Sequence, residues 1–544
     1  MAVKGKSWSL LFYFNYGKVI VLSKLRTADE VAALIEDGMT IGISLMGLAG
    51  WAEEVAQAIE RRFLETGHPR DLTIVSSSGA GDDKEYGLTR FGHEGMVKRW
   101  IAGIMRQAPK LGKLVQENKI EAYNFPQGVV VQLWREIAAK RPGLITKVGL
   151  GTYIDPRIEG GKMNSKTTED LIKVLEIDGE EYLFYPSFHV DVALIRGSVA
   201  DENGNLTMDR EGIFLEALPL AQAAKNCGGI VIAQAEEIAQ ANTLHPKRVK
   251  VPGILVDYIV QPTKPEHHMQ TEAKYYVPSF AGEVKIPLSA VPSMPLDERK
   301  IIARRAAMEL IPDAIVNLGI GIPADVAAVA AEEDVSHLMT LTTESGTIGG
   351  VPASPPDFGH SYNAEAIIEH HAQFDFYDGG GIDIAFLGMA QADKDGNVNV
   401  TKFGNRVVGS GGFINISQNS RKVVYCGTFT AGGLKVDVKD GKLIIVQEGK
   451  HKKFVEHVDQ ISYSGKYARQ VGQPAIYVTE RAVFSLEKEG LTLIEIAPGI
   501  DLEKDVLAHM GFKPIISPNL KTMDPGMFFE KWGGLAEIIN AKAK

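Results

Sequence analysis

An internal repeat restricts the fold of this chain more than any other feature of the sequence. The segment VDVALIRGSVADENGNL (190–206) matches IDIAFLGMAQADKDGNV (382–398) without a gap. In both copies an apolar run typical of a buried strand precedes a turn sequence, DENGN or DKDGN. The repeat therefore predicts that one folding unit occurs twice in the chain.

Strands alternate with helices in both copies. The segment MTIGISLMGLAGWAEEVAQAIERRF (39–63) corresponds to AIVNLGIGIPADVAAVAAEE (314–333), and each contains an apolar strand, a glycine loop and a helical pattern. Such alternation is typical of parallel sheets covered by helices. We expect an α/β protein with two duplicated α/β domains and mainly parallel sheets. A proline-marked stretch with little periodicity, residues 260–299, separates the two copies.

Charge and cysteine content exclude several classes of function. The formal net charge of -10 argues against nucleic acid or an anionic membrane as the main partner. No segment approaches the roughly 20 apolar residues that a membrane span needs. Cys227 and Cys426 are too few for a disulfide framework, which indicates a reducing cytoplasm. The apolar N-terminal stretch is interrupted by Asn15 and Lys18, so we do not expect a signal peptide.

A single glutamate, Glu344, stands in the segment LTTESGTIGGVP (341–352), between a threonine-rich strand pattern and a glycine cluster. A carboxylate is therefore expected at the tip of a strand, among small residues and bare backbone. The matching position in the first copy is Ser77 or Ser78. A strand followed by a loop does not by itself require glutamate here, which makes Glu344 a candidate for chemistry.

Two further segments supply hydrogen-bond donors. In GNRVVGSGGFINIS (404–417), glycines leave backbone N–H groups free to bind a phosphate or an oxyanion. Gln127 lies in a Pro-Gln-Gly turn just before a predicted helix. Each segment alone is more simply a turn, but an acid, a side-chain amide and bare backbone together suggest acyl transfer. The adjacent His370 and His371 would point in different directions, so they do not predict a metal site.

The loop NLGIGIPA (317–324) permits another interpretation. Its G-x-G-x-x-A pattern between a strand and a helix resembles a dinucleotide fingerprint, with Glu344 as a ribose partner. This NAD-binding dehydrogenase hypothesis leaves the glycine loop around Glu344 unexplained.

Many segments in the same order resemble the family I CoA-transferases, among them EYLFYPSF, VKVPGILVDYIV, TESGTIGGVPA, QFDFYDGGGIDIAFLG, GSGGFINISQN and CGTFTAGGLKV. The sequence is most similar to the propionate and acetate CoA-transferases, in which both halves are fused in one polypeptide. The resemblance extends from about residue 22 to 530. It divides the chain into an N-terminal extension (1–21), a first CoA-transferase domain (22–275), a linker (276–296), a second domain (297–530) and a C-terminal tail (531–544).

The resemblance also implies roles for individual residues. Glu344 matches the nucleophile, which becomes a glutamyl-CoA thioester, and Gln127 matches a side-chain donor to the oxyanion. Gly411 and Gly412 match a glycine pair whose backbone N–H groups complete the oxyanion hole. The residues expected to contact CoA are Asn317, Gly319, Gly321, Gly409 and Phe413.

The implied enzyme is a cytoplasmic CoA-transferase. It would move CoA from a short-chain acyl-CoA, such as propionyl-, acetyl- or butyryl-CoA, to a carboxylate such as acetate by a ping-pong mechanism. It would use CoA as a substrate, without a metal or other cofactor, and would form a homo-oligomer, with a tetramer favoured.

Two alternatives remain besides the dehydrogenase: an acyl-CoA hydrolase on the same scaffold and a non-catalytic CoA-binding module. The loops SLMGLAGWAEE (44–54) and SSSGAGDD (76–83) depart from the patterns of relatives. We expect these loops to line the acyl pocket, and so the sequence does not determine which acyl chain the enzyme accepts.

Overall fold

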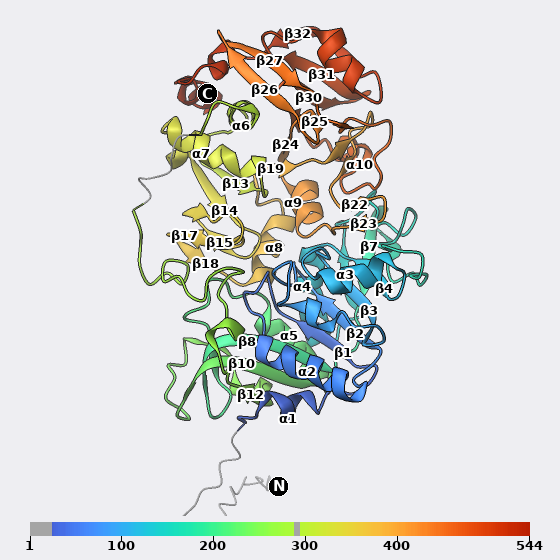
Figure 1. The fold of residues 1–544 in the computed structure, drawn as a ribbon, viewed down its shortest axis with the longest axis vertical. Coiled ribbons are helices and arrows are strands. Elements are labelled where there is room, and N and C mark those ends of the chain that lie inside the picture. Colours follow the sequence, from blue (N-terminus) through green and yellow to red (C-terminus); the bar gives the residue numbers. More distant parts are fainter. Residues whose placement is uncertain (1–23, 288–293, 544) are drawn as a thin grey trace, which may run out of the picture.

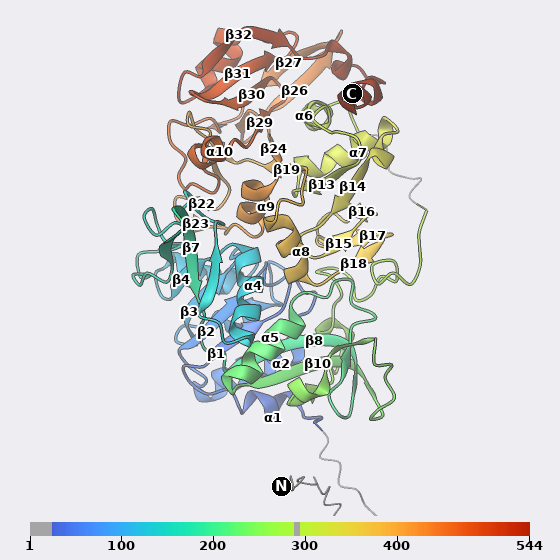
Figure 2. The same cartoon turned by 180° about the vertical axis from the view of Figure 1, so that it is seen from behind.

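The computed structural model describes residues 24–287 and 294–543, and the predicted extension 1–21 lies outside this part of the chain. Two α/β halves are stacked along the long axis of the molecule, with the first half at the bottom of Figures 1 and 2 and the second at the top. The active-site candidates come from both halves, so the way the halves meet decides the geometry of the site.

A nine-stranded sheet organises the first half. Seven of its strands, in the order β12-β10-β8-β1-β2-β3-β4, each pair in parallel with the next. The other two strands are antiparallel: β9 pairs with β8, and β11 pairs with β9. The strands are β1 (Thr40–Ile43), β2 (Leu72–Ser76), β3 (Val97–Ala102), β4 (Glu121–Asn124), β8 (Val192–Asp201), β9 (Leu206–Thr207), β10 (Ile230–Ala239), β11 (Val249–Val251) and β12 (Tyr258–Val260).

A ten-stranded sheet organises the second half, in the order β18-β15-β14-β13-β19-β24-β29-β30-β31-β32. The strands β14, β13, β19, β24 and β29 pair in parallel, and antiparallel pairs flank them on both sides. The strands are β13 (Ala314–Leu318), β14 (Met339–Thr342), β15 (Thr347–Ile348), β18 (Ala366–Ile367), β19 (Ile384–Gly388), β24 (Lys422–Cys426), β29 (Ala475–Val478), β30 (Ala482–Glu487), β31 (Gly490–Ile496) and β32 (Ile515–Thr522).

The two sheets share a duplicated centre. The order β12-β10-β8-β1-β2 in the first half corresponds to β29-β24-β19-β13-β14 in the second. The repeated aspartates make the same contact: Asp191 accepts a hydrogen bond from the Thr40 N–H at 2.8 Å, and Asp383 accepts one from Ile315 at 2.9 Å. The predicted α/β fold with mainly parallel sheets is therefore confirmed.

Helices cover the sheets and join the halves. The first half contains α1 (Ala28–Ala32), α2 (Glu53–Thr66), α3 (Pro109–Gln116), α4 (Gln127–Ala138) and α5 (Ala217–Cys227). The second contains α6 (Glu298–Ala307), α7 (Asp325–Glu332), α8 (His370–Asp378), α9 (Phe413–Asn419), α10 (Gly465–Val471) and α11 (Leu535–Asn540). Each half has its own hydrophobic core, but Val131 of α4 packs in the second core and Ile414 of α9 packs in the first. The halves therefore interlock through these helices.

The predicted linker and the predicted C-terminal tail both contain residues that pack against the rest of the protein. The predicted tail contains α11, whose Leu535 and Ile539 are buried in the second core because they lie on one face of the helix. In the predicted linker, the ring of Phe280 packs against His360 and Tyr362, with ring centroids 5.0 and 4.7 Å apart. In the described part of the chain, no helix combines the length and apolarity needed to cross a bilayer.

Candidate active site

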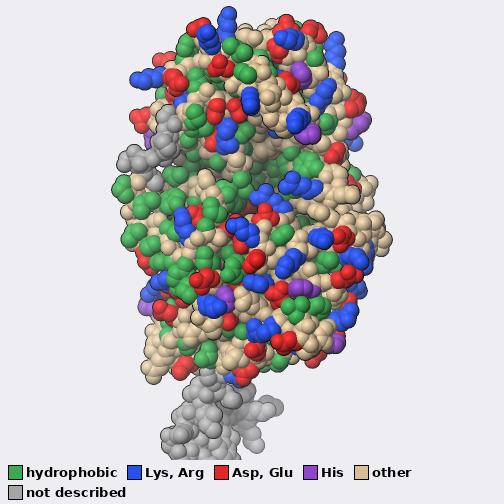
Figure 3. Space-filling view, viewed as in Figure 1, with side chains coloured by type: hydrophobic (Ala, Val, Ile, Leu, Met, Phe, Trp, Pro, Cys, Tyr) green, Lys and Arg blue, Asp and Glu red, His purple; other side chains and the backbone are tan. Residues whose placement is uncertain are grey.

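A cavity of about 360 Å³ lies where the two halves meet. The first half contributes Met46, Gly47, Ser78, Gly79, Gln107 and Glu272 to its wall. The second half contributes Asn317, Glu344, Leu387, Gly409, Gly412 and Phe413. Figure 3 shows that the molecular surface is hollowed, with hydrophobic side chains gathered around the recess. Both first-half loops that were expected to line an acyl pocket reach this cavity.

Glu344 lies at the tip of a hairpin formed by β14 and β15. The Thr343 N–H donates to the Thr347 carbonyl at 3.0 Å and the Gly346 N–H donates to the Thr343 carbonyl, which closes a tight turn. Gly346 has a φ of 106°, a conformation that favours glycine. The hydroxyl of Ser345 is bonded to the Gly359 carbonyl. These contacts hold the loop, so Glu344 extends from a fixed backbone.

The Glu344 carboxylate faces donors from two separate elements. A β-carbon at position 412 would lie 2.1 Å from its Oε2 atom, so only glycine leaves room there. Burial raises the pKa of Glu344, whereas the neighbouring Gln127 amide and Gly412 N–H lower it. The side chain is enclosed by protein apart from its partial exposure to the cavity. These donors favour the ionised form that a nucleophile needs.

Gln127 begins α4 and is fully buried. Its backbone N–H donates to the Gly411 carbonyl at 3.0 Å, which ties the start of α4 to the second half. Its amide nitrogen lies 2.9 Å from Nε2 of His370. Gln127 is thus held through both its backbone and its side chain, beside Glu344.

The two predicted glycine donors behave differently. The N–H of Gly411 donates to the Gly103 carbonyl at 2.9 Å, and so it is not free to bind an oxyanion in this conformation. Gly411 has a φ of 53°, and this left-handed turn directs the next N–H, that of Gly412, to Glu344. The expected role of Gly411 as a second donor is therefore corrected: its backbone shapes the turn.

Most of the predicted CoA-contacting residues line the cavity. Asn317, Gly319, Gly409 and Phe413 are in its wall, whereas Gly321 is not. Asn317 is anchored by a 3.3 Å hydrogen bond from its amide to the Thr342 carbonyl. Their contact with CoA remains a prediction.

An acidic group that was not predicted from the sequence, Glu272, stands in the first-half wall of the cavity. Burial raises the pKa of Glu272 to about 7, although a hydrogen bond from the Gln107 amide opposes this effect. Gly47 and Gly79 make room for this pair, because β-carbons there would lie 2.8 Å from Glu272 and 1.5 Å from Gln107. No sequence signal marks Glu272, because it lies in an irregular segment near the end of the predicted first domain.

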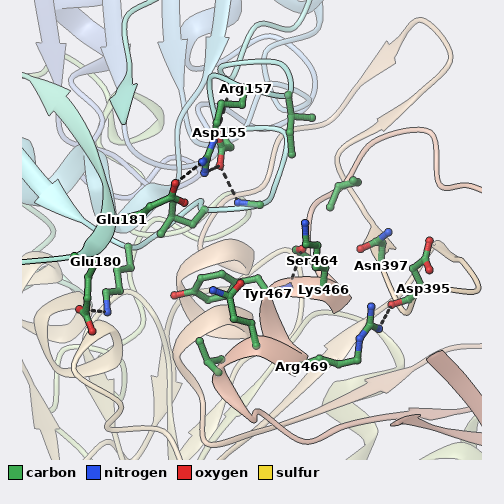
Figure 4. A pocket seen from close by; sticks show the side chains of 18 residues that line it. Asp155, Arg157, Glu180, Glu181, Asp395, Asn397, Ser464, Lys466, Tyr467 and Arg469 are labelled. Carbon is green, nitrogen blue, oxygen red and sulfur yellow. Dashed lines mark hydrogen bonds and ion pairs between the residues drawn. The ribbon is translucent and has the colours of Figure 1, made fainter. Parts of the chain in front are cut away.

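A larger groove of about 850 Å³ lies elsewhere between the halves, beside α10 (Figure 4). Its charged side chains largely neutralise one another: Lys147 pairs with Glu180, and Arg157 pairs with Asp155 and Glu181. None of the predicted site residues lines it. We therefore place the candidate active site in the smaller cavity that contains Glu344. Within residues 24–287 and 294–543, we find no group of three or more His, Cys, Asp or Glu side chains arranged to hold a metal ion.

Two α/β halves that meet around one enclosed glutamate, with amide donors at its carboxylate, define an acyl-transfer site. The family model of coenzyme A transferase matches residues 25–262. Caffeate CoA-transferase of Acetobacterium woodii is 57% identical, covering 95% of this chain and all of that protein. Acetate CoA-transferase YdiF of Escherichia coli K12 is 43% identical, covering 94% of this chain and 96% of that protein.

A solved structure of the acyl-CoA transferase YdiF from E. coli O157:H7, in a thioester complex with CoA, superposes with a TM-score of 0.88. It is 42% identical and covers 94% of this chain and 97% of that chain. The chain belongs to the coenzyme A transferase family and is a CoA-transferase. The glycine loop 317–324 accordingly belongs to a CoA-transferase, and the dehydrogenase interpretation was wrong.

Proposed function

We propose that this CoA-transferase moves CoA between carboxylic acids through a covalent thioester on Glu344. The observation that carries the proposal is the position of the Glu344 carboxylate, enclosed between the halves beside Gln127 and Gly412. The thioester complex of the related YdiF structure supports a covalent intermediate of this kind. No metal, ATP or redox cofactor is needed for the reaction.

The chemistry follows from the enclosure of the site. Attack of the carboxylate on an acyl-CoA carbonyl forms an acyl-glutamyl anhydride and releases the CoA thiolate. The thiolate then attacks the glutamyl carbonyl, which gives glutamyl-CoA and releases the first acid. A second acid reverses these steps. Positioning the glutamate beside the thioester can remove up to about 7–11 kcal/mol of the barrier, and exclusion of water protects glutamyl-CoA from hydrolysis.

Short-chain acids, with acetate as acceptor, are our first substrate proposal, supported by the relationship to the acetate CoA-transferase. A hydroxylated aryl acid is the second, supported by 57% identity to a caffeate CoA-transferase and by the polar pair Glu272 and Gln107 in the cavity wall. These two groups could bind a hydroxyl at the far end of an acyl chain.

Mass spectrometry tests the covalent step. The enzyme is incubated with acyl-CoA, reduced with borohydride and digested, and the modified peptide is identified. Modification should map to Glu344, and a modified peptide that lacks this residue would contradict the proposal. Acyl-exchange assays with acetate, propionate, butyrate, cinnamate and caffeate then distinguish the substrate classes.

Steady-state kinetics separate a transferase reaction from hydrolysis. Varying acyl-CoA at several fixed acid concentrations should give parallel double-reciprocal lines, because a covalent intermediate makes the reaction ping-pong. Rapid release of free CoA without an acceptor acid would instead favour the hydrolase.

We also propose a cytoplasmic homo-oligomer, with a tetramer favoured, and light scattering measures the subunit number.

A further inference from the structure

A row of buried hydrogen bonds extends from Gln127 away from the cavity. Nε2 of His370 lies 2.9 Å from the Gln127 amide nitrogen, and Nδ1 of His370 lies 2.7 Å from the Glu216 carboxylate. The hydroxyl of Ser77 donates to the other Glu216 oxygen at 2.6 Å. All four side chains have 0% exposure, so water does not compete for these contacts.

The Glu216 carboxylate selects the tautomer of His370. An ionised carboxylate only accepts hydrogen bonds, so Nδ1 of His370 carries the proton that faces it. The amide nitrogen of Gln127 can only donate, so its 2.9 Å contact makes Nε2 an acceptor and the ring neutral, and Nε2 takes one N–H from that amide. The second N–H of that amide remains for Glu344, consistent with the hydrogen bond that lowers the pKa of Glu344.

The opposite orientation of the Gln127 amide would be unfavourable. It would place the amide oxygen against Nε2 of His370 and against the Glu344 carboxylate, both of which are acceptors in this arrangement. In the observed orientation the amide oxygen has no hydrogen-bond partner and lies beside Gly411. A buried unpaired oxygen costs about 1–3 kcal/mol. The contacts with His370 and Glu344 must therefore outweigh this loss.

We propose that His370 is a positioning residue for the transfer reaction: fixed by Glu216, it orients the Gln127 amide so that one N–H faces Glu344. The inference rests on the proposed function of Glu344. Gln127, Glu216 and Ser77 belong to the first half, whereas His370 begins α8 in the second. Docking of α8 onto the first half therefore completes the donor arrangement.

The backbone around His370 allows this role to be tested. The His370 N–H donates to the Leu215 carbonyl at 3.1 Å, a contact that side-chain variants retain. Glutamine can place its amide oxygen near the position of Nε2, whereas asparagine reaches only the position of Nδ1. We therefore expect His370→Gln to keep more activity than His370→Asn, which should lower the rate constant for thioester formation by about 10–100-fold. The KM for acyl-CoA should change much less.

A double-mutant cycle separates positioning from general support of the fold. If His370 acts through Gln127, His370→Asn should cause little further loss in a Gln127→Ala background. Full additivity of the two effects would overturn the proposal, as would equal rates for His370→Asn and wild type. His371→Asn is the matched control, since His371 lies on the same helix, partly buried, near Arg135 and Asp375. It should retain the wild-type rate.

The experiment also distinguishes failure of this inference from failure of the proposed function. Thioester formation on Glu344 is measured first in the wild-type enzyme with acyl-CoA in a single turnover. An absent adduct in wild type rejects the covalent mechanism. A normal adduct in wild type, formed equally fast by His370→Asn, rejects only the role of His370. Thermal unfolding of each variant verifies that the fold is intact.

Discussion

Glu344 and Gly412, 68 residues apart in the chain, are so close that a β-carbon on Gly412 would lie 2.1 Å from Oε2 of Glu344. The contact joins the tip of the β14–β15 hairpin to the start of α9. Gly412 has a φ of -79°, which any residue can adopt, so space and not backbone strain requires glycine here. The bare N–H of Gly412 can thereby approach the carboxylate directly.

Gly412→Ala should lower kcat about 10²-fold, because the methyl group must displace the carboxylate by roughly 1 Å. The N–H of residue 412 is retained, so the loss would reflect displacement of Glu344. Gly112→Ala on α3 is the control, since its β-carbon would meet only the Met105 carbonyl, at 3.4 Å. Unchanged turnover in a folded Gly412→Ala enzyme would show that Glu344 is not held as described.

Glu344→Gln should lower transfer by about three orders of magnitude or more, because the amide is not nucleophilic and cannot form the thioester. The replacement keeps the size of the side chain, so the cavity should keep its shape. Circular dichroism and thermal unfolding verify the fold, while acyl exchange measures activity. A folded variant that retains more than a few per cent of wild-type activity would refute the nucleophilic role.

Activity should fall in acid as Glu344 becomes protonated, since only the carboxylate attacks. Burial raises the pKa of Glu344, so this fall should occur at a higher pH than for an exposed glutamate. The Gln127 amide lowers that pKa, and its removal in Gln127→Ala should shift the acid limb to still higher pH. Single-turnover rates between pH 4 and 9 measure the shift, with Gln132→Ala on the same helix as control. An acid limb at the same pH in Gln127→Ala and in wild type would show that Gln127 does not act on the Glu344 carboxylate.

Glu272 should make folding stability depend on pH. Its pKa is raised to about 7 in the folded protein, so the folded state favours the protonated form. The free energy of unfolding should therefore decrease as pH rises from the ordinary glutamate range to about 7, and Glu272→Gln should remove this part of the decrease. Thermal unfolding at pH 5 and 8 tests this: relative to wild type, the variant should be more stable at pH 8 than at pH 5. An equal stability difference between variant and wild type at both pH values would contradict the raised pKa of Glu272.

Glu272 also offers a test of the second substrate proposal. If it binds a hydroxyl of an aryl acid, Glu272→Ala should lower kcat/KM for caffeoyl-CoA relative to cinnamoyl-CoA by about 2–10-fold, the loss of one hydrogen bond. Transfer between acetyl-CoA and propionate should be affected much less. An equal loss for both aryl substrates would indicate that Glu272 does not select the hydroxyl.

The sequence alone determined the duplicated architecture, because its signals are local. The repeated turns have the same contacts in both halves: Asp201 accepts from the Asn205 amide and Asp393 from the Asn397 amide, each at 3.0 Å. Such turns depend on residues four positions apart, so they can be recognised from the sequence. The strand before Glu344 and the helix after Gln127 were likewise predicted from local patterns.

The sequence and the family resemblance also selected Glu344, Gln127 and Gly412 as candidates, since each stands in an unusual local setting. Only the tertiary structure decided how they are supported. The Gly411 N–H is taken by Gly103, and His370 meets Glu216 from 154 positions away in the chain. Both contacts are set by the docking of one half on the other, where packing across the interface rather than local propensity fixes which atoms meet. For that reason Glu344 could be selected as a candidate from the sequence, whereas the row of buried side chains from Gln127 to Ser77 could not be predicted.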